Sequence, residues 1–289
     1  MRFLESVYKI EWEEVLLCRV SIVLPVYNRR HCIARAVDSI MEQTFPDYEL
    51  IIVDDNSADG TGEYIKSLPD RRIKFIPLSR NVGAGGARNI GIKEAAGEYI
   101  AFQDSDTVWM ADKLEKLVMY LDSLEDSVAM VYSPYKRIYQ DYSIIYPSLD
   151  VPLEEKSGHI LKNLLEHPLV DTPTMLVRKD VLKELGGFDS HMKALEDYEL
   201  SIRIAGKYQI GIIDEVLLLS YNESDSISND SIRYIQNAFY LLKKHKELFK
   251  QYDMTMTYLN QLSQYALQYN QLDRYVENLQ KFMGGRNEE

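Results

Sequence analysis

The first third of the chain alternates between runs of β-branched and aliphatic side chains and stretches in which apolar residues recur at helical spacing. The runs are typical of buried strands, which we expect over 20–27, 48–53, 73–76 and 98–103. The stretches between them predict helices over 33–41, around 64–68 and from 87 to about 96. Strand and helix in this alternation predict an α/β fold with a mostly parallel sheet flanked by helices.

The pattern is mixed in the middle of the chain and wholly helical near its C-terminal end. Strands are expected over 128–132, 139–146, 172–178 and 210–219. Helices are expected over 158–166, up to a glycine cap at 186–187, and over 196–205. From Ser231 the apolar stripes have helical spacing. We therefore expect an N-terminal segment 1–17, an α/β domain 18–225 and an α-helical C-terminal extension 226–289. Three roles are open for the extension: a cap packed on the core, a homodimer contact, or a contact with a membrane surface.

Charge and cysteine content narrow the class of protein. The chain has 33 Lys and Arg residues against 45 Asp and Glu residues, which gives a net charge of -12. Nucleic-acid-binding proteins require a basic face, so this charge argues against that class. Two cysteines leave no disulfide framework, which suits a reducing compartment. No apolar run approaches the roughly 18 residues of a membrane span, and the first residues lack the apolar core of a signal peptide. We expect a cytoplasmic protein that does not bind nucleic acid.

Polar side chains follow several of the predicted strands at the point where each strand ends. Tyr27 follows the first strand, Asp55 the second, and Asp104 and Asp106 the fourth. Ligands of open α/β sheets bind outside the carboxyl ends of the strands, so these side chains are expected to meet at one edge of the sheet.

The carboxylates at this edge suggest two kinds of contact. Asp104 and Asp106 have a spacing that suits a hard divalent cation, which takes few protein ligands and fills its shell with water and phosphate oxygens. An Asp-Ser-Asp triplet is equally a solvated turn. Asp55 can accept hydrogen bonds from a base or ribose, or it can cap the next helix. We expect Asp59 to be the cap.

A loop with three glycines, ending at Gly86, precedes Arg88 after the third strand. A dinucleotide-binding fingerprint requires a glycine where Arg88 stands and a place after the first strand, so that interpretation fails. Either the loop lets backbone approach a phosphate or sugar, with Arg88 supplying positive charge, or it is a plain tight turn.

The pair Glu196-Asp197 begins a predicted helix and is the candidate for a general base. Two negative charges at a helix N-terminus are also favourable without any catalytic role. The five histidines show no paired ligand spacing, and there is no nucleophile elbow. The sequence therefore leaves Glu196-Asp197 as the candidate for acid–base chemistry and offers no convincing candidate nucleophile.

These motifs stand in a series that resembles a known family. Residues 20–28 read Val-Ser-Ile-Val-Leu-Pro-Val-Tyr-Asn, 51–61 read Ile-Ile-Val-Asp-Asp-Asn-Ser-Ala-Asp-Gly-Thr, 81–91 follow Asn-x-Gly-x-x-x-Ala-Arg-Asn-x-Gly, and 97–106 follow Gly-Glu-Tyr-Ile-x-Phe-x-Asp-Ser-Asp. Gly-Gly-Phe-Asp at 186–189 then precedes Glu196-Asp197. In this order they closely resemble the family-2 inverting glycosyltransferases of the GT-A fold, over about residues 18–222.

The resemblance implies transfer of one sugar from a nucleotide-diphospho-sugar, commonly a UDP-sugar, to an acceptor hydroxyl with inversion at the anomeric carbon. It also implies a Rossmann-like GT-A sheet and a divalent cation, Mn²⁺ or Mg²⁺. Carried over by position, the nucleotide would lie against Pro25, Val26, Tyr27, Asp55, Gly86, Arg88, Asp104 and Ser105, with Tyr27 stacked on the base. Asp106 would be the principal metal ligand, with Asp104 beside it. Asp197 would deprotonate the acceptor, with Glu196 next to it.

The resemblance further implies a saccharide or lipid-linked saccharide acceptor, surface polysaccharide or glycoconjugate synthesis, and a place in the cytoplasm or at the inner face of the cell membrane. Many relatives have an acidic residue at the position of Thr107, and some have a histidine after the last strand, where this chain has Tyr221-Asn222. Both departures bear on the metal ligands. The Gln-x-x-Arg-Trp pattern of processive relatives does not occur, which favours one sugar per acceptor visit.

Two other classes fit parts of the sequence. A nucleotidyltransferase also uses a carboxylate-held metal on an α/β sheet, but its glycine- and lysine-containing loop is replaced here by Pro25-Val-Tyr-Asn. A non-catalytic nucleotide- or sugar-binding scaffold would not require the metal pair and Asp197 together. A glycosyltransferase is therefore the favoured prediction.

Overall fold

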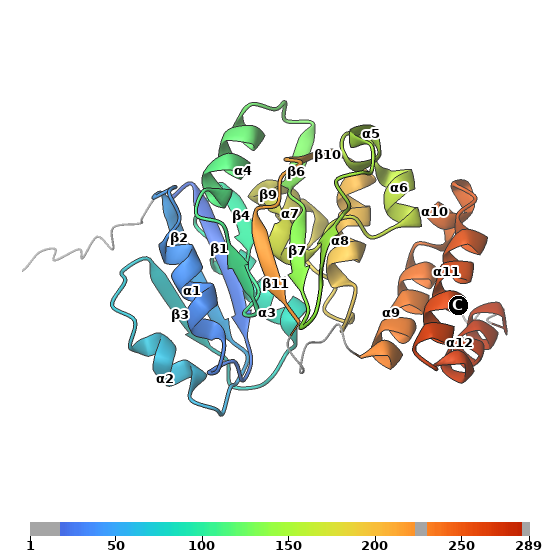
Figure 1. Cartoon of the computed structure of the whole chain (residues 1–289), viewed down its shortest axis with the longest axis horizontal. Helices are drawn as coiled ribbons and strands as arrows, with labels where there is room; N and C mark the ends of the chain where they lie inside the picture. The colour runs from blue at the N-terminus through green and yellow to red at the C-terminus, as the bar shows by residue number, and fades with distance from the viewer. Residues whose placement is uncertain (1–17, 223–229, 285–289) are drawn as a thin grey trace, which may run out of the picture.

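A seven-stranded sheet forms the centre of the structure, a computed structural model that describes residues 18–222 and 230–284 (Figure 1). The strand order is β10-β6-β9-β4-β1-β2-β3. The strands are β1 (Val20–Val26), β2 (Tyr48–Asp54), β3 (Ile73–Pro77), β4 (Tyr99–Phe102), β6 (Val128–Tyr132), β9 (Leu176–Arg178) and β10 (Gln209–Ile212). Neighbours are parallel except around β9, which runs antiparallel to β4 and β6. The predicted α/β sheet is confirmed, whereas the expected segment 1–17 and the boundary at 225 lie outside the described residues.

Helices cover both faces of this sheet, and each face has its own hydrophobic core. On one face lie α1 (Ile33–Met41), α2 (Thr61–Lys66) and α4 (Lys113–Asp122). On the other lie α3 (Ala84–Glu94), α6 (Leu161–Glu166), α7 (Lys179–Leu185) and α8 (Glu196–Ala205). Ile22 and Leu24 of β1 point into the first core and Val23 into the second. A strand buried on both faces is apolar at every position, which is why these strands appear as continuous runs in the sequence.

The helix α3 lies unusually close to β1. A Cβ atom at Gly91 would lie 2.3 Å from Cγ1 of Val23, so a side chain at this position would push helix and strand apart. The helix also begins at Ala84, three residues earlier than the sequence suggested, because Gly83 enters it with a φ of 82°. The close approach and the early start bring the first turn of α3 and Arg88 over the end of β1.

A second, smaller sheet packs beside the first, in the order β5-β11-β7-β8. Its strands are β5 (Thr107–Trp109), β11 (Leu218–Tyr221), β7 (Tyr135–Ile138) and β8 (Ser143–Tyr146), and a short helix α5 (Leu153–Lys156) follows. Three expectations were wrong here. The strand expected over 139–146 is only the second arm of a hairpin, the strand over 210–219 is divided between β10 and β11 in different sheets, and 172–178 opens with a 3₁₀ turn at Thr172–Thr174.

The C-terminal helices α9 (Ser231–Lys244), α10 (Lys246–Gln251), α11 (Thr255–Gln268) and α12 (Leu272–Gly284) pack beside α6 and α8 (Figure 1). Ile235, Phe239 and Leu242 of the predicted stripe on α9 are buried. On α12 the stripe expected from Leu272, Val276 and Leu279 was right only for Leu279, which packs against this core, whereas Leu272 and Val276 are exposed and Tyr275 is buried instead.

A buried ion cluster ties α9 to α8. The carboxylate of Glu199 lies 2.7 Å from Arg203, 2.8 Å from Lys244 and 3.0 Å from His245. Burial alone would raise the pKa of Glu199, but hydrogen bonds from His245, Arg203 and Lys244 outweigh burial and lower it to about 2. Lys244 also pairs with Asp189 at 2.6 Å. These partners hold α9 against the α/β domain through charge as well as through apolar packing.

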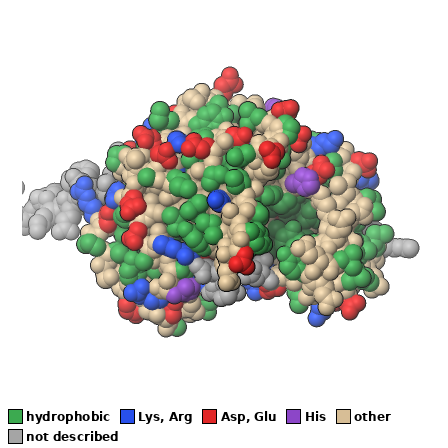
Figure 2. Space-filling model, in the orientation of Figure 1, with side chains coloured by type: hydrophobic (Ala, Val, Ile, Leu, Met, Phe, Trp, Pro, Cys, Tyr) green, Lys and Arg blue, Asp and Glu red, His purple; other side chains and the backbone are tan. Residues whose placement is uncertain are grey.

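The surface agrees with the acidic composition. Acidic side chains spread along the upper edge of the face in Figure 2, with basic ones among them. Within 18–222 and 230–284, no helix has both the length and the apolar character that crossing a bilayer requires.

Candidate active site

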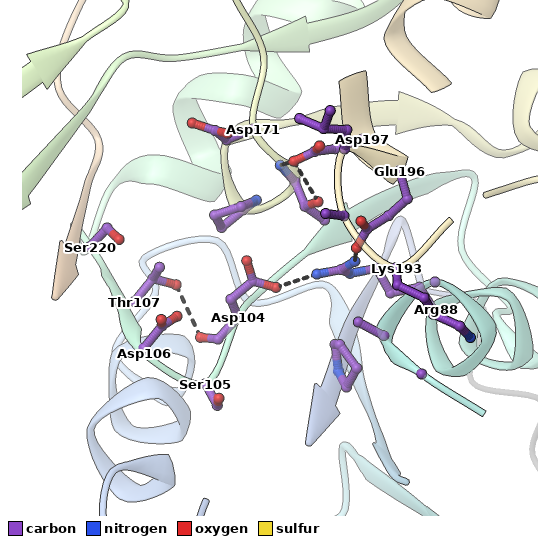
Figure 3. A pocket seen from close by; sticks show the side chains of 18 of the residues that line it. Arg88, Asp104, Ser105, Asp106, Thr107, Asp171, Lys193, Glu196, Asp197 and Ser220 are labelled. Carbon is purple, nitrogen blue, oxygen red and sulfur yellow. Dashed lines mark hydrogen bonds and ion pairs between the residues drawn. The ribbon is translucent and has the colours of Figure 1, made fainter. Parts of the chain in front are cut away.

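A cavity of about 1080 Å³ opens at the edge of the main sheet where β1, β2 and β4 end. The predicted site residues that line it are Pro25, Val26, Tyr27, Asp55, Arg88, Asp104, Ser105, Asp106, Glu196 and Asp197. Figure 3 labels the last six of these. Gly86 is the exception. It faces Val82, whose Cγ2 would lie 3.0 Å from a Cβ at Gly86, and the cavity is lined instead by Gly83 and Gly85.

Asp55 holds the glycine loop in place. Its two carboxylate oxygens accept hydrogen bonds from the backbone N–H groups of Val82 (2.7 Å) and Gly83 (2.8 Å). Each oxygen retains acceptor capacity for a further donor, since a carboxylate offers about four lone-pair sites. The expected cap at Asp59 was wrong, because the N-cap of α2 is Gly60 in a left-handed conformation; Asp59, one residue before it, accepts from the N–H of Thr61 (3.0 Å). Asp55 is therefore left to organise the cavity wall.

Arg88 joins the two sides of the cavity. Its guanidinium lies 2.8 Å from Asp104 and 2.7 Å from Glu196, and its side chain is only 6% exposed. Burial by itself would lower the pKa of Arg88, but the two carboxylates outweigh it and raise the pKa. Figure 3 shows the arginine lying between the loop after β4 and the first turn of α8. One planar cation thus sets the distance between these two segments.

We expect Arg88→Lys to lower the free energy of unfolding by about 2 kcal/mol, because an ammonium group cannot form both bonds in a fixed fork and leaves one buried carboxylate unpaired. In a chain of this size that loss lowers the melting temperature by about 4–8 °C, measurable by calorimetry. Arg72→Lys is the matched control. Its pair with Asp70 has side chains 28% and 27% exposed, so a change below about 1 kcal/mol is expected. Equal losses in the two variants would contradict the bridging role.

The loop after β4 presents two carboxylates to the cavity. Burial raises the pKa of Asp106 to about 6, and the neighbouring Asp104 carboxylate raises it in the same direction. In the described part of the chain no third His, Cys, Asp or Glu joins them in a metal-binding group. Two carboxylates that repel each other beside an open cavity fit Mn²⁺ or Mg²⁺, which would take its remaining ligands from water and a diphosphate.

Asp197 lies across the cavity from this loop, at the N-terminus of α8 (Figure 3). Its Oδ2 accepts from the N–H (3.0 Å) and hydroxyl (3.1 Å) of Thr172, and its Oδ1 accepts from the N–H of Tyr198 (2.8 Å). Burial raises the pKa of Asp197 to about 7, with the carboxylates of Asp171 and Glu196 acting in the same direction. A carboxylate with a pKa near neutrality can accept a proton efficiently at neutral pH.

Sequence reasoning missed several lining residues. Asp171 reaches the cavity from the turn before β9, and its buried Oδ2 has no hydrogen-bond partner within the described residues. It stands in an irregular segment that carries no periodic signal. Tyrosines from four elements also line the cavity: Tyr135, Tyr146, Tyr234, Tyr265 and Tyr269. Those on α9 and α11 could not be assigned to a site, because a helical stripe does not reveal which face of the helix borders a cavity.

Comparison with known proteins gives a family match. The sequence model of Glycosyl transferase family 2 matches residues 21–186, more than half of the chain. A UDP-Glc:α-D-GlcNAc-diphosphoundecaprenol β-1,3-glucosyltransferase from Escherichia coli is 39% identical over 119 residues, which are 41% of this chain and 46% of that enzyme. The alignment thus spans less than half of the relative's own length.

Two solved structures show the same fold at low sequence identity. The TarS protein of S. aureus, residues 1–349, solved with UDP-GlcNAc, has a TM-score of 0.73 and 17% identity, covering 91% of this chain and 80% of that one. A mannosyltransferase from Pyrobaculum calidifontis, solved with GDP-Man and Mn²⁺, has a TM-score of 0.65 and 19% identity, covering 93% and 76%. Both likenesses place the described residues in the GT-A fold.

Proposed function

Because this chain belongs to glycosyl transferase family 2, we propose that it transfers one sugar from a UDP-sugar to an acceptor hydroxyl, with inversion at the anomeric carbon. The observation that carries the proposal is the placement of a carboxylate pair, Asp104 and Asp106, and a separate carboxylate, Asp197, on opposite sides of one cavity. Inversion by a single displacement requires a base on the face opposite the leaving group and no protein nucleophile.

The position of each residue in the cavity suggests its role in binding or catalysis. Tyr27, 48% exposed at the end of β1, would stack on the base of the nucleotide. The loop held by Asp55 would approach the diphosphate with backbone N–H groups. Asp197 would take the proton from the attacking hydroxyl. Glu196 is bound to Arg88, so it would position α8 and would not itself accept the proton.

Asp104 and Asp106 would hold the divalent cation, which supplies charge stabilisation to the departing diphosphate as a Lewis acid. The structure supports this assignment through the repulsion between the two carboxylates and their place on the cavity wall. Relatives support the choice of ligands. One is named for UDP-Glc and a lipid-linked acceptor, and one solved neighbour contains Mn²⁺.

A panel of nucleotide sugars with Mn²⁺ tests the proposal. A donor that binds the native state raises the melting temperature. At a concentration of a hundred times its Kd, it adds about 2.7 kcal/mol to the free energy of unfolding. We expect a UDP-sugar to give the largest shift and to be cleaved with release of UDP when an acceptor is present. No shift with any nucleotide sugar, or release of pyrophosphate from a nucleoside triphosphate and a sugar phosphate, would contradict the proposal.

The pH dependence of transfer follows from the environment of Asp197. Its raised pKa means that it is protonated below about pH 7, so kcat/KM should fall about tenfold per pH unit below that value and level off above it. The titratable and charged groups that face it are Asp171, Glu196, Arg88, Tyr146 and Tyr234. Asp171→Asn removes one negative neighbour and should shift the acid limb to lower pH. An acid limb that stays in place in this variant would contradict the assignment.

The acceptor is proposed to be a saccharide or lipid-linked saccharide of a surface polysaccharide or glycoconjugate, glycosylated at the inner face of the cell membrane.

The C-terminal helices α11 and α12 carry exposed apolar side chains, which are Met256, Leu267, Leu272, Val276 and Met283. Two contacts are predicted for them, a lipid surface or a second copy of the chain. Flotation with anionic vesicles tests the first, and sedimentation equilibrium tests the second. Neither contact is supported if the protein remains monomeric and unbound.

A further inference from the structure

Part of the cavity lining consists of tyrosines. Tyr135 of β7 and Tyr146 of β8 line it from the second sheet, with ring centroids 6.1 Å apart. Tyr234 of α9 and Tyr265 of α11 line the same cavity and are stacked, with ring centroids 4.2 Å apart. Tyr269 packs on Tyr265 in a tilted arrangement with ring centroids 4.6 Å apart, so that three rings adjoin one another. We call Tyr234, Tyr265 and Tyr269 the tyrosine wall.

The tyrosine wall has a fixed place relative to Asp197. The N–H of Lys193, just before α8, donates to Oδ1 of Asn237 on α9 (2.9 Å). The ion cluster around Glu199 joins the same two helices. Asp197 and Tyr234 line the same cavity, and burial, with the negative charge of Asp197 as a smaller cause, raises the pKa of Tyr234. A wall that is held by the catalytic helix can position a substrate against the catalytic base.

The chemistry of the wall suits a sugar ring. A pyranose presents an apolar C–H face and polar hydroxyls at its rim, and a tyrosine presents an apolar ring and a polar tip. Tyr269 is half exposed, at 48%, so part of its ring is available to a ligand. Arg233 lines the same region and adds a charged donor. A polyprenyl chain would be matched by aliphatic side chains, which are few along this wall.

We propose that the tyrosine wall is the subsite for the saccharide ring of the acceptor, so that the C-terminal helices form part of the substrate site and are more than a cap on the core. The proposal rests on the proposed function, because it takes the tyrosine-lined side of the cavity as the acceptor side. It adds the ligand class, a pyranoside, and the residues that bind it.

The acceptor itself is unidentified, so the probes are methyl β-D-glucopyranoside, its N-acetylglucosamine counterpart and octyl β-D-glucopyranoside. Saturation-transfer NMR is recorded on the full chain in the presence of UDP and Mn²⁺. We expect transfer to the ring C–H protons of all three probes. Tyr269→Ala should weaken this binding about fivefold, because one aromatic contact is lost. Tyr265→Phe, which keeps the ring, should retain most of it.

Tyr240→Ala is the matched control. Tyr240 is on α9, as Tyr234 is, and its exposed fraction of 41% is close to that of Tyr269. Its hydroxyl donates a hydrogen bond to Asp189, however, and it does not line the cavity. It should bind the probes like the unaltered protein, and calorimetry should give the same UDP affinity for every variant. The proposal is overturned if no probe receives transfer, if Tyr269→Ala binds as well as Tyr240→Ala, or if transfer is confined to the octyl chain. If the unaltered protein did not bind UDP at all, that result would instead refute the proposed function.

Discussion

Asp197→Asn is expected to lower the rate of sugar transfer by about a thousandfold, within the range that general-base catalysis contributes. The asparagine has nearly the same shape and can keep a hydrogen bond to Thr172, but it cannot accept a proton from the acceptor hydroxyl. The affinity for UDP should hardly change, because Asp197 lies across the cavity from the Asp104–Asp106 loop. Steady-state transfer kinetics and calorimetry with UDP give the two readouts.

Asp180→Asn is the matched control for this variant. Asp180 is also at the start of a helix, α7, and its Oδ1 accepts from the next N–H at 2.9 Å, as Oδ1 of Asp197 does at 2.8 Å. It is exposed and does not line the cavity, so transfer should be unchanged. If Asp197→Asn lost UDP affinity and turnover to the same extent, Asp197 would be a structural residue and the assignment of the base would be wrong.

The second large effect is expected for Asp106→Ala. Without this carboxylate the cation would have lost its principal protein ligand, so Mn²⁺ should no longer raise the affinity for UDP. The transfer rate should fall at least about a hundredfold, since a metal contributes several kcal/mol to the stabilisation of a leaving diphosphate. Calorimetry with UDP, with and without Mn²⁺, measures the first effect directly.

The fold should survive this change. The negative charge of Asp104 and burial both disfavour the ionised form of Asp106, so its removal relieves repulsion and the melting temperature should not fall. Asp141→Ala, in the exposed hairpin turn between β7 and β8, is the control and should retain the Mn²⁺ effect. Undiminished enhancement of UDP binding by Mn²⁺ in Asp106→Ala would refute the metal assignment.

Much of the α/β core could be predicted because its strands are buried on both faces. Their apolar runs end in polar loops, and parallel strands bring those ends to one edge. Asp55, Asp104 and Asp106 could thus be placed together without coordinates. The strands of the second sheet could not be predicted as well. Its strands are short and pair across long sequence distances, as β5 does with β11, so tertiary partners decide where each begins and ends.

The role of Arg88 shows a different limit. The sequence indicated a positive charge near the nucleotide, and the residue does line the cavity. Its two ion pairs are with Asp104, 16 residues away, and Glu196, 108 residues away. No local pattern predicts such a bridge, because it depends on how α3 and α8 pack on the same face of the sheet. Asp171 was missed for the same reason, because its burial and its place in the cavity depend on tertiary packing.

The cluster around Glu199 limits how this molecule can be re-engineered or can diverge. Grafting a foreign segment in place of α9 without equivalents of Lys244 and His245 would remove two of the three side chains that pair with the buried Glu199 carboxylate and leave it with Arg203 alone, which should lower the free energy of unfolding. Chimeras should therefore exchange α8 and α9 as a unit. Point changes at Tyr265 and Tyr269 of the proposed acceptor subsite would leave the ion cluster around Glu199 intact.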